Sequence, residues 1–172
     1  AILPTRPARS AAQYKTIWMP EGSPLRVHSE QLRDAIQREL GDVPVELGMQ
    51  YGQPSIASGM ARLRARGADR VLAAPLYPQF ATSSTGSSME RVFRAAAATW
   101  AMPAICQLPP FYDAPEFLDA FAEVARPALA EFKQDHLLFS FHGLPERHMR
   151  RSDVSGNHCF SSERCCDAVT AP

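Results

Sequence analysis

The 172-residue chain lacks an excess of charge of either sign. Lysine and arginine total 18, aspartate and glutamate also total 18, and the formal net charge is zero. A domain that binds the phosphate backbone of a nucleic acid carries a clear excess of basic residues. The composition therefore argues against nucleic acid as a partner.

The chain also has little cysteine and no long apolar run. Its four cysteines are too few and too unevenly spaced for a disulfide framework, which predicts reduced thiols. No apolar run approaches the roughly 20 residues that span a bilayer, and the start lacks the layout of a secretory signal. We predict a cytoplasmic protein without a transmembrane segment.

Helical and strand patterns alternate along most of the chain. Apolar spacing predicts helices over residues 29–40, 54–67 and 115–133, and from about residue 87. Apolar or alternating runs predict strands at residues 43–49, 70–76, 102–108 and 137–141. This alternation indicates an α/β fold built on a mostly parallel sheet with helices on both faces. In the last long helix, we expect the buried side to be Phe117, Phe121, Val124 and Leu129.

One strand end joins a buried run to a chemically versatile side chain. Residues 137–141 are mostly apolar, and His142 follows directly, before Gly143 and Pro145. Open parallel sheets bind ligands at the carboxyl ends of their strands. An imidazole at such a place can accept a proton or ligate a metal ion. His142 is therefore a candidate catalytic residue, and a hydrogen-bonded structural role is the alternative.

Three unusual loops follow predicted strands, at residues 51–54, 77–88 and 142–145. A parallel sheet would bring them to one edge, where aromatic rings, hydroxyls and an imidazole suit a large planar ligand with polar substituents. Ser84 and Thr85 precede a predicted helix start, which favours anions. A capping role would also explain these two residues.

Three motifs resemble those of the bacterial ferrochelatase family. They are Ser-Phe-His-Gly-Leu-Pro at residues 140–145, Tyr-Pro-Gln-Phe with Ser-Ser-Thr-Gly-Ser within residues 77–87, and Glu-Gly-Ser-Pro-Leu at residues 21–25. The resemblance covers residues 1–151 and implies a flavodoxin-like (chelatase-like) domain whose sheet is incomplete at its amino end. A poorly defined, cysteine-containing tail follows at residues 152–172. Only the first half of the family's pattern is matched.

The resemblance implies a lyase that inserts ferrous iron into protoporphyrin IX, or a related porphyrin, in the terminal stage of haem biosynthesis. It assigns His142 either to metal delivery or to acceptance of a pyrrole proton. Two N–H protons must leave the macrocycle, and one imidazole nitrogen cannot accept a proton and ligate iron at once. Because the family's second domain supplies an acidic partner, we expect impaired turnover from this chain alone.

The same resemblance places further residues near the porphyrin, its propionates or the rim of its cleft. Guanidinium and hydroxyl groups recognise carboxylates. These candidate binding residues are Arg6, Tyr14, Ser23, Tyr51, Tyr77, Ser84 and Thr85. Ser23 could instead cap the helix that follows it. Gln50 stands where the family often carries arginine, so a carboxylate contact is not carried over to this position.

The expected partners are porphyrin and ferrous iron, both as substrates. No required cofactor is expected. Peripheral membrane contact is compatible with the full-length enzyme. His158, Cys159, Cys165 and Cys166 form a rival metal site, but their spacing fits no strong zinc signature. The ligands of the [2Fe–2S] cluster that some ferrochelatases hold lie largely outside the matched half, so no cluster is expected. The alternatives are a non-catalytic tetrapyrrole-binding or metal-binding half-domain and a cobalt chelatase.

Overall fold

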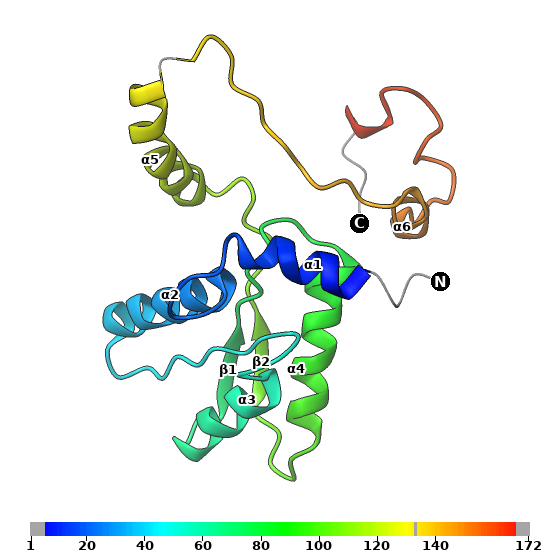
Figure 1. The fold of residues 1–172 in the computed structure, drawn as a ribbon. Helices are drawn as coiled ribbons and strands as arrows, with labels where there is room; N and C mark the ends of the chain where they lie inside the picture. Colours follow the sequence, from blue (N-terminus) through cyan, green and yellow to red (C-terminus); the bar gives the residue numbers. More distant parts are fainter. Residues whose placement is uncertain (1–5, 133, 168–172) are drawn as a thin grey trace. The chain divides into compact units, whose positions relative to one another are not determined.

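The structure, a computed structural model, describes residues 6–132 and 134–167, apart from the side chains of Arg6 and Arg9. The chain divides into two compact units, Ala1–Pro110 (unit 1) and Phe111–Pro172 (unit 2) (Figure 1). The elements of unit 1 are α1 (Arg6–Lys15), α2 (Pro24–Leu40), α3 (Ile56–Ala65), β1 (Arg70–Ala73), the π-helix η1 (Thr82–Gly86), α4 (Ser87–Ala97) and β2 (Ala104–Gln107). Unit 2 contains α5 (Pro115–Phe132), α6 (Glu146–Ser152) and the short 3-10 helix η2 (Cys165–Asp167).

Serine caps set the starts of two helices in unit 1. The Ser23 hydroxyl accepts a hydrogen bond from the backbone N–H of Arg26 at 3.3 Å, and Pro24 occupies the first turn of α2. Helix α2 therefore begins earlier than the predicted residue 29. The Ser55 hydroxyl caps α3 in the same way, at 3.1 Å from the N–H of Ser58.

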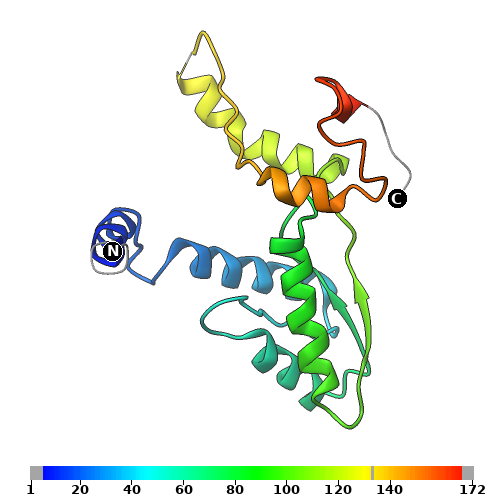
Figure 2. The ribbon, with the colours of Figure 1, turned by 90° about the vertical axis from the view of Figure 1, so that its right-hand side faces the viewer.

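The predicted parallel pairing is confirmed for β1 and β2. Their register runs from Arg70 opposite Ala104 to Ala73 opposite Gln107, and both strands are shorter than predicted. Helices α3 and α4 contact each other and lie on the same side of the strand pair (Figure 2). The α/β class is thus confirmed, and the second covered face of the sheet stays a prediction.

The apolar core of the described residues lies in unit 1. Its buried side chains come from α2, β1 and α4: Val27, Val71, Met89, Val92 and Ala96. The three from α4 follow helical spacing, so this helix presents one continuous apolar stripe to the core.

The strand predicted at residues 43–49 is wrong. Only Met49 makes a bridge, to Ser55, and the preceding backbone has no regular structure. The Gln37 amide on α2 instead donates to the carbonyls of Gly41 and Val43 and accepts from the N–H of Val45. A side chain thus satisfies backbone groups that a neighbouring strand would otherwise pair.

Two predictions in unit 2 are also wrong. Residues 137–141 form no strand, and Leu138 is 91% exposed. An extended segment becomes a strand only when a neighbour pairs with its backbone, and no strand within the described residues does so. Helix α5 forms as predicted, but none of its described residues is buried, and Phe121 and Val124 are exposed.

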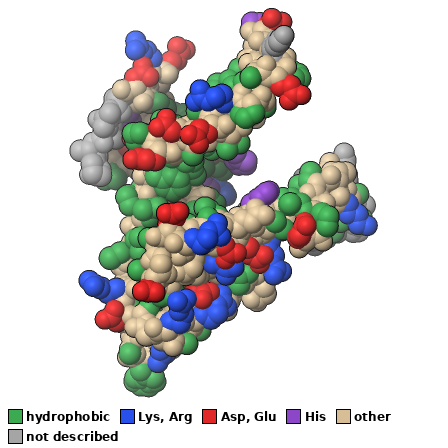
Figure 3. Space-filling view, turned by 90° about the vertical axis from the view of Figure 1, so that its left-hand side faces the viewer, with side chains coloured by type: hydrophobic (Ala, Val, Ile, Leu, Met, Phe, Trp, Pro, Cys, Tyr) green, Lys and Arg blue, Asp and Glu red, His purple; other side chains and the backbone are tan. Residues whose placement is uncertain are grey.

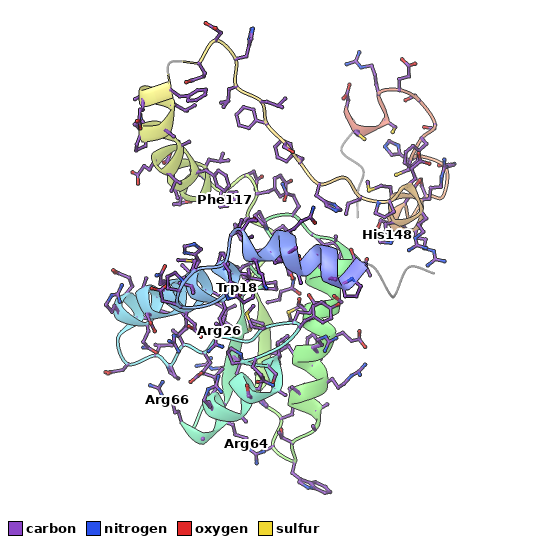
Figure 4. All side chains as sticks on the ribbon, in the orientation of Figure 1. Trp18, Arg26, Arg64, Arg66, Phe117 and His148 are labelled. Carbon is purple, nitrogen blue, oxygen red and sulfur yellow. The ribbon has the colours of Figure 1, made fainter. Side chains whose placement is uncertain are left out.

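Aromatic packing orders the start of α5. The ring of Phe117 meets those of Phe111 and Phe121 edge to face, at centroid distances of 5.3 and 5.2 Å (Figure 4). No helix among the described residues is long and apolar enough to cross a membrane.

Candidate functional site

The polar segment that follows β1 turns into α4 through a π-helix. In η1 the N–H of Gly86 bonds to the carbonyl of Ala81 at 3.1 Å, and the Ser87 hydroxyl lies 3.0 Å from the carbonyl of Ser83. Single-turn π-helices occur frequently at functional sites. The predicted helix start near Ser87 is confirmed, whereas the π-helix carries no signal in the sequence pattern.

The Gln50 amide joins this segment to the loop that precedes α3. Its Oε1 accepts hydrogen bonds from the Tyr77 hydroxyl at 3.1 Å and the Ser88 hydroxyl at 3.2 Å. Its Nε2 donates to the Ser87 hydroxyl at 2.5 Å. Two of the three loops expected at one sheet edge therefore meet within unit 1.

Tyr51 and Tyr77 lie on this junction with accessible rings. The Tyr51 side chain is 76% exposed, and the Arg91 guanidinium of α4 lies over its ring at 5.3 Å from the centroid. Tyr77 is 39% exposed while its hydroxyl is held by Gln50. Both rings can stack on a flat ligand.

Ser84 and Thr85 lie within η1 and differ in accessibility. The Ser84 hydroxyl is half-buried and donates to the carbonyl of Ala81 at 3.3 Å. Thr85 is buried, and its hydroxyl has no hydrogen-bond partner among the described residues. Burial favours a structural role for Thr85, and its place as a ligand contact stays a prediction.

The other candidates of unit 1 lie near its amino end. Tyr14, on α1, is 60% exposed, and Trp18 in the turn after α1 is exposed as well (Figure 4). Ser23 is the cap of α2, as its alternative interpretation expects. Arg6 begins α1, but its side chain lies outside the described residues.

His142 belongs to unit 2. It lies in the irregular segment between α5 and α6, three residues before the Pro145 that precedes α6, and its side chain is exposed. Exposure leaves both ring nitrogens accessible for a proton or a metal ion. Its predicted place at the end of a paired strand is wrong.

Comparison with known proteins identifies a family. A family model, Ferrochelatase, matches residues 1–170. The chain belongs to the ferrochelatase family. It is 47% identical over 170 residues to the ferrochelatase of Pseudomonas fluorescens strain Pf0-1, with 99% of this chain and 50% of the relative covered. The ferrochelatase of Azotobacter vinelandii is 48% identical over 165 residues, with 96% of this chain and 48% of the relative covered. The chain thus spans about half the length of the curated relatives it matches.

The segment that follows α6 is organised around a carboxylate. Asp153 accepts hydrogen bonds from the Ser155 hydroxyl at 2.6 Å and from the backbone N–H groups of His158 and Cys159, each at 2.8 Å. These bonds, the Ser155 hydroxyl first, hold the pKa of Asp153 well below its ordinary value.

Two of the tail cysteines, Cys159 and Cys166, have thiols whose pKa is raised. Burial, with the nearby charge of Asp153, raises the pKa of the Cys159 thiol. The hydrogen bond with Cys165, whose sulfur lies 4.0 Å away, raises the pKa of Cys166. Among the described residues, no group of three or more His, Cys, Asp or Glu side chains could hold a metal ion.

Sequence patterns do not predict the Gln50 junction or the Arg91 contact. Gln50 bonds to groups 27 to 38 positions away, a separation that no local pattern encodes. The only signal was the crowding of hydroxyl residues at 82–88 beside a tyrosine-bearing loop.

Proposed function

We propose that this chain supplies the porphyrin-binding wall and the metal-insertion histidine of a ferrochelatase, which inserts ferrous iron into protoporphyrin IX or a related porphyrin. The observation that carries the proposal is the match of the ferrochelatase family model to residues 1–170. The identity of nearly one half to named ferrochelatases supports it. The reaction belongs to the terminal stage of haem biosynthesis.

His142 is proposed as the catalytic residue. When ferrous iron enters the macrocycle, four pyrrole nitrogens bind it and two N–H protons leave. A neutral imidazole nitrogen can accept one of these protons, or it can bind the iron before transfer. One nitrogen cannot do both at once. The exposure of His142 is compatible with either role.

The porphyrin wall is proposed to include Tyr51 and Tyr77. Their exposed rings offer stacking surface, and the contact between Gln50 and the start of α4 holds the two tyrosine-bearing segments together. The further proposed contacts are Arg6, Tyr14, Ser23, Ser84 and Thr85. Guanidinium and hydroxyl groups of this kind suit the propionates of a porphyrin.

The proposal also covers the domain bounds, the location and the substrates. The chelatase-like domain is proposed to extend over residues 1–151, with residues 152–172 as its tail. We propose a cytoplasmic location, with peripheral membrane contact in a protein of the relatives' full length. Ferrous iron and porphyrin act as substrates, and the predictions of no required cofactor and no [2Fe–2S] cluster remain predictions.

The test replaces His142 in a polypeptide of the relatives' full length that contains these 172 residues. His142→Ala should slow iron insertion, followed by the absorption change of the porphyrin, by about 100-fold or more, the scale of general base catalysis. His136→Ala, an exposed histidine in the same irregular segment, is the matched control and should leave the rate unchanged.

Two other outcomes would redirect the proposal. Porphyrin binding without insertion, unaffected by His142→Ala, would indicate a non-catalytic tetrapyrrole binder. Faster insertion of cobalt than of ferrous iron by the unmodified protein would indicate a cobalt chelatase. A full rate of iron insertion in the His142→Ala protein would overturn the catalytic assignment.

A further inference from the structure

The hydrogen-bonding capacity of the Gln50 side chain is nearly used up by the protein itself. A primary amide offers two acceptor positions on oxygen and two N–H donors. The oxygen accepts from Tyr77 and Ser88, and one N–H group donates to Ser87. One N–H donor is therefore the remaining capacity for a ligand, which points to an action of Gln50 through its neighbours.

Ser87 extends this network into the π-helix. Its hydroxyl accepts from Gln50 and lies within hydrogen-bond distance of two carbonyls of η1, those of Ser83 at 3.0 Å and Ser84 at 3.2 Å. Gln50 lies in the loop before α3. It thus links this loop to the segment after β1 and to the first turn of α4. Ser88 is buried and Gln50 is half-buried, which reduces competition from water.

The direction of the Tyr77 bond determines what this residue can offer a ligand. Its hydroxyl hydrogen points to Gln50 Oε1, so the phenol oxygen presents only lone pairs elsewhere. The bond also fixes how the half-exposed ring is presented. An arginine at position 50 would supply donors alone and could not accept this hydroxyl hydrogen.

We propose that Gln50 is a positioning residue of the porphyrin wall, which fixes the Tyr77 ring and the junction of η1 with α4 against the loop at residues 50–54. The proposal rests on the proposed function of this wall, because it assigns to Gln50 the arrangement of groups that contact the macrocycle. In this role Gln50, whose amide oxygen is occupied by Tyr77 and Ser88, influences porphyrin affinity through its neighbours.

The experiment measures protoporphyrin affinity of the 172-residue chain by absorption titration, beside amide hydrogen exchange. Gln50→Leu should weaken binding about fivefold, the scale of one net hydrogen bond. It should also increase exchange over residues 83–88. Tyr77→Phe in the Gln50→Leu background should cost no further affinity, because the two residues act as one unit.

A conservative variant and a matched control separate positioning from general stability. Gln50→Glu keeps an acceptor for Tyr77 and Ser88 but loses the N–H that donates to Ser87, so its loss of affinity should be smaller than that of Gln50→Leu. The control is Gln37→Leu, since the Gln37 amide also makes three hydrogen bonds in unit 1, at the far end of α2. It should raise exchange near residues 41–45 and leave porphyrin affinity unchanged.

Defined results would overturn the proposal. Gln50→Leu with unchanged affinity would do so, as would an equal loss of affinity in Gln37→Leu, which would indicate a global stability effect. If the unmodified chain binds no porphyrin, the proposed function of the wall fails. Hydrogen exchange then tests, without porphyrin, whether Gln50 positions η1 and α4. Unchanged exchange over residues 83–88 in Gln50→Leu would refute this positioning role.

Discussion

Unit 1 and unit 2 use their apolar residues differently. Every buried apolar side chain among the described residues lies in unit 1, on α2, β1 or α4. Helix α5 of unit 2 also has a periodic apolar pattern, yet Val124 is 83% exposed and Phe132 is 82% exposed. Figure 3 shows hydrophobic side chains distributed over the surface. Periodicity therefore predicts a helix, whereas burial also needs a facing partner.

The largest expected effect comes from one substitution made in both units. Val92→Ala in α4 removes two buried methyl groups and should lower the free energy of unfolding by about 2 kcal/mol. Val124→Ala in α5 removes exposed methyl groups and replaces valine by a better helix former. It should change stability by about 0.5 kcal/mol or less, in the stabilising direction.

Urea unfolding followed by circular dichroism measures both variants. Equal losses in Val92→Ala and Val124→Ala would show that the apolar side of α5 is buried in solution. The two units would then differ in what their apolar helices pack against, and not in how strongly those helices pack.

The same difference explains which predictions from sequence succeed. Helices α3, α4 and α5 are encoded locally by apolar spacing, with the Ser55 cap added at α3, and the sequence pattern predicts all three. The parallel pair β1 and β2 was also predicted, because both strands are short apolar runs between helices. The strand predicted at residues 137–141 does not form. Strand pairing depends on a neighbouring strand, and the pattern of a single segment carries no information on that neighbour.

The candidate site divides in a similar way. Its place after a predicted strand makes His142 a candidate, the helix start that follows does so for Ser84, and the family resemblance adds Tyr77. The hydrogen bonds of Gln50 depend on how two distant loops meet, so sequence reasoning missed them. Thr85 was singled out as a hydroxyl group, but its burial depends on tertiary packing.

A smaller effect is expected at the helix starts of unit 1. Ser23→Ala and Ser55→Ala each remove a side-chain cap and should each lower the free energy of unfolding by about 1 kcal/mol. The two caps are matched, but only Ser23 is a proposed porphyrin contact. Ser23→Ala should therefore also weaken porphyrin binding, measured by absorption titration, while Ser55→Ala should not. Equal affinities in both variants would leave Ser23 with the capping role alone.

The smallest effect on global unfolding is expected in the tail of unit 2, which is ordered by polar contacts. Asp153 accepts hydrogen bonds from Ser155, His158 and Cys159, and these bonds lower its pKa from the ordinary 3.8. A carboxyl group whose pKa is lower in the folded than in the unfolded chain stabilises the folded loop at pH values above its unfolded pKa. That contribution is lost as the pH falls from about 3.8 toward the lower folded value.

The amide proton signals of His158 and Cys159, followed by NMR against pH, report this transition directly. The difference in these two signals between the unmodified chain and Asp153→Asn should stay constant from neutral pH down to about 3.8 and change only below it. Asp153→Asn should displace both signals at neutral pH and abolish the acid transition, because an amide oxygen replaces a charged acceptor of two oxygens. Asp119→Asn on the exposed surface of α5 is the control and should leave both signals unchanged. If the component that Asp153→Asn removes is centred at or above 3.8, the hydrogen-bonded loop is contradicted, since a free or desolvated carboxyl group titrates at or above that value.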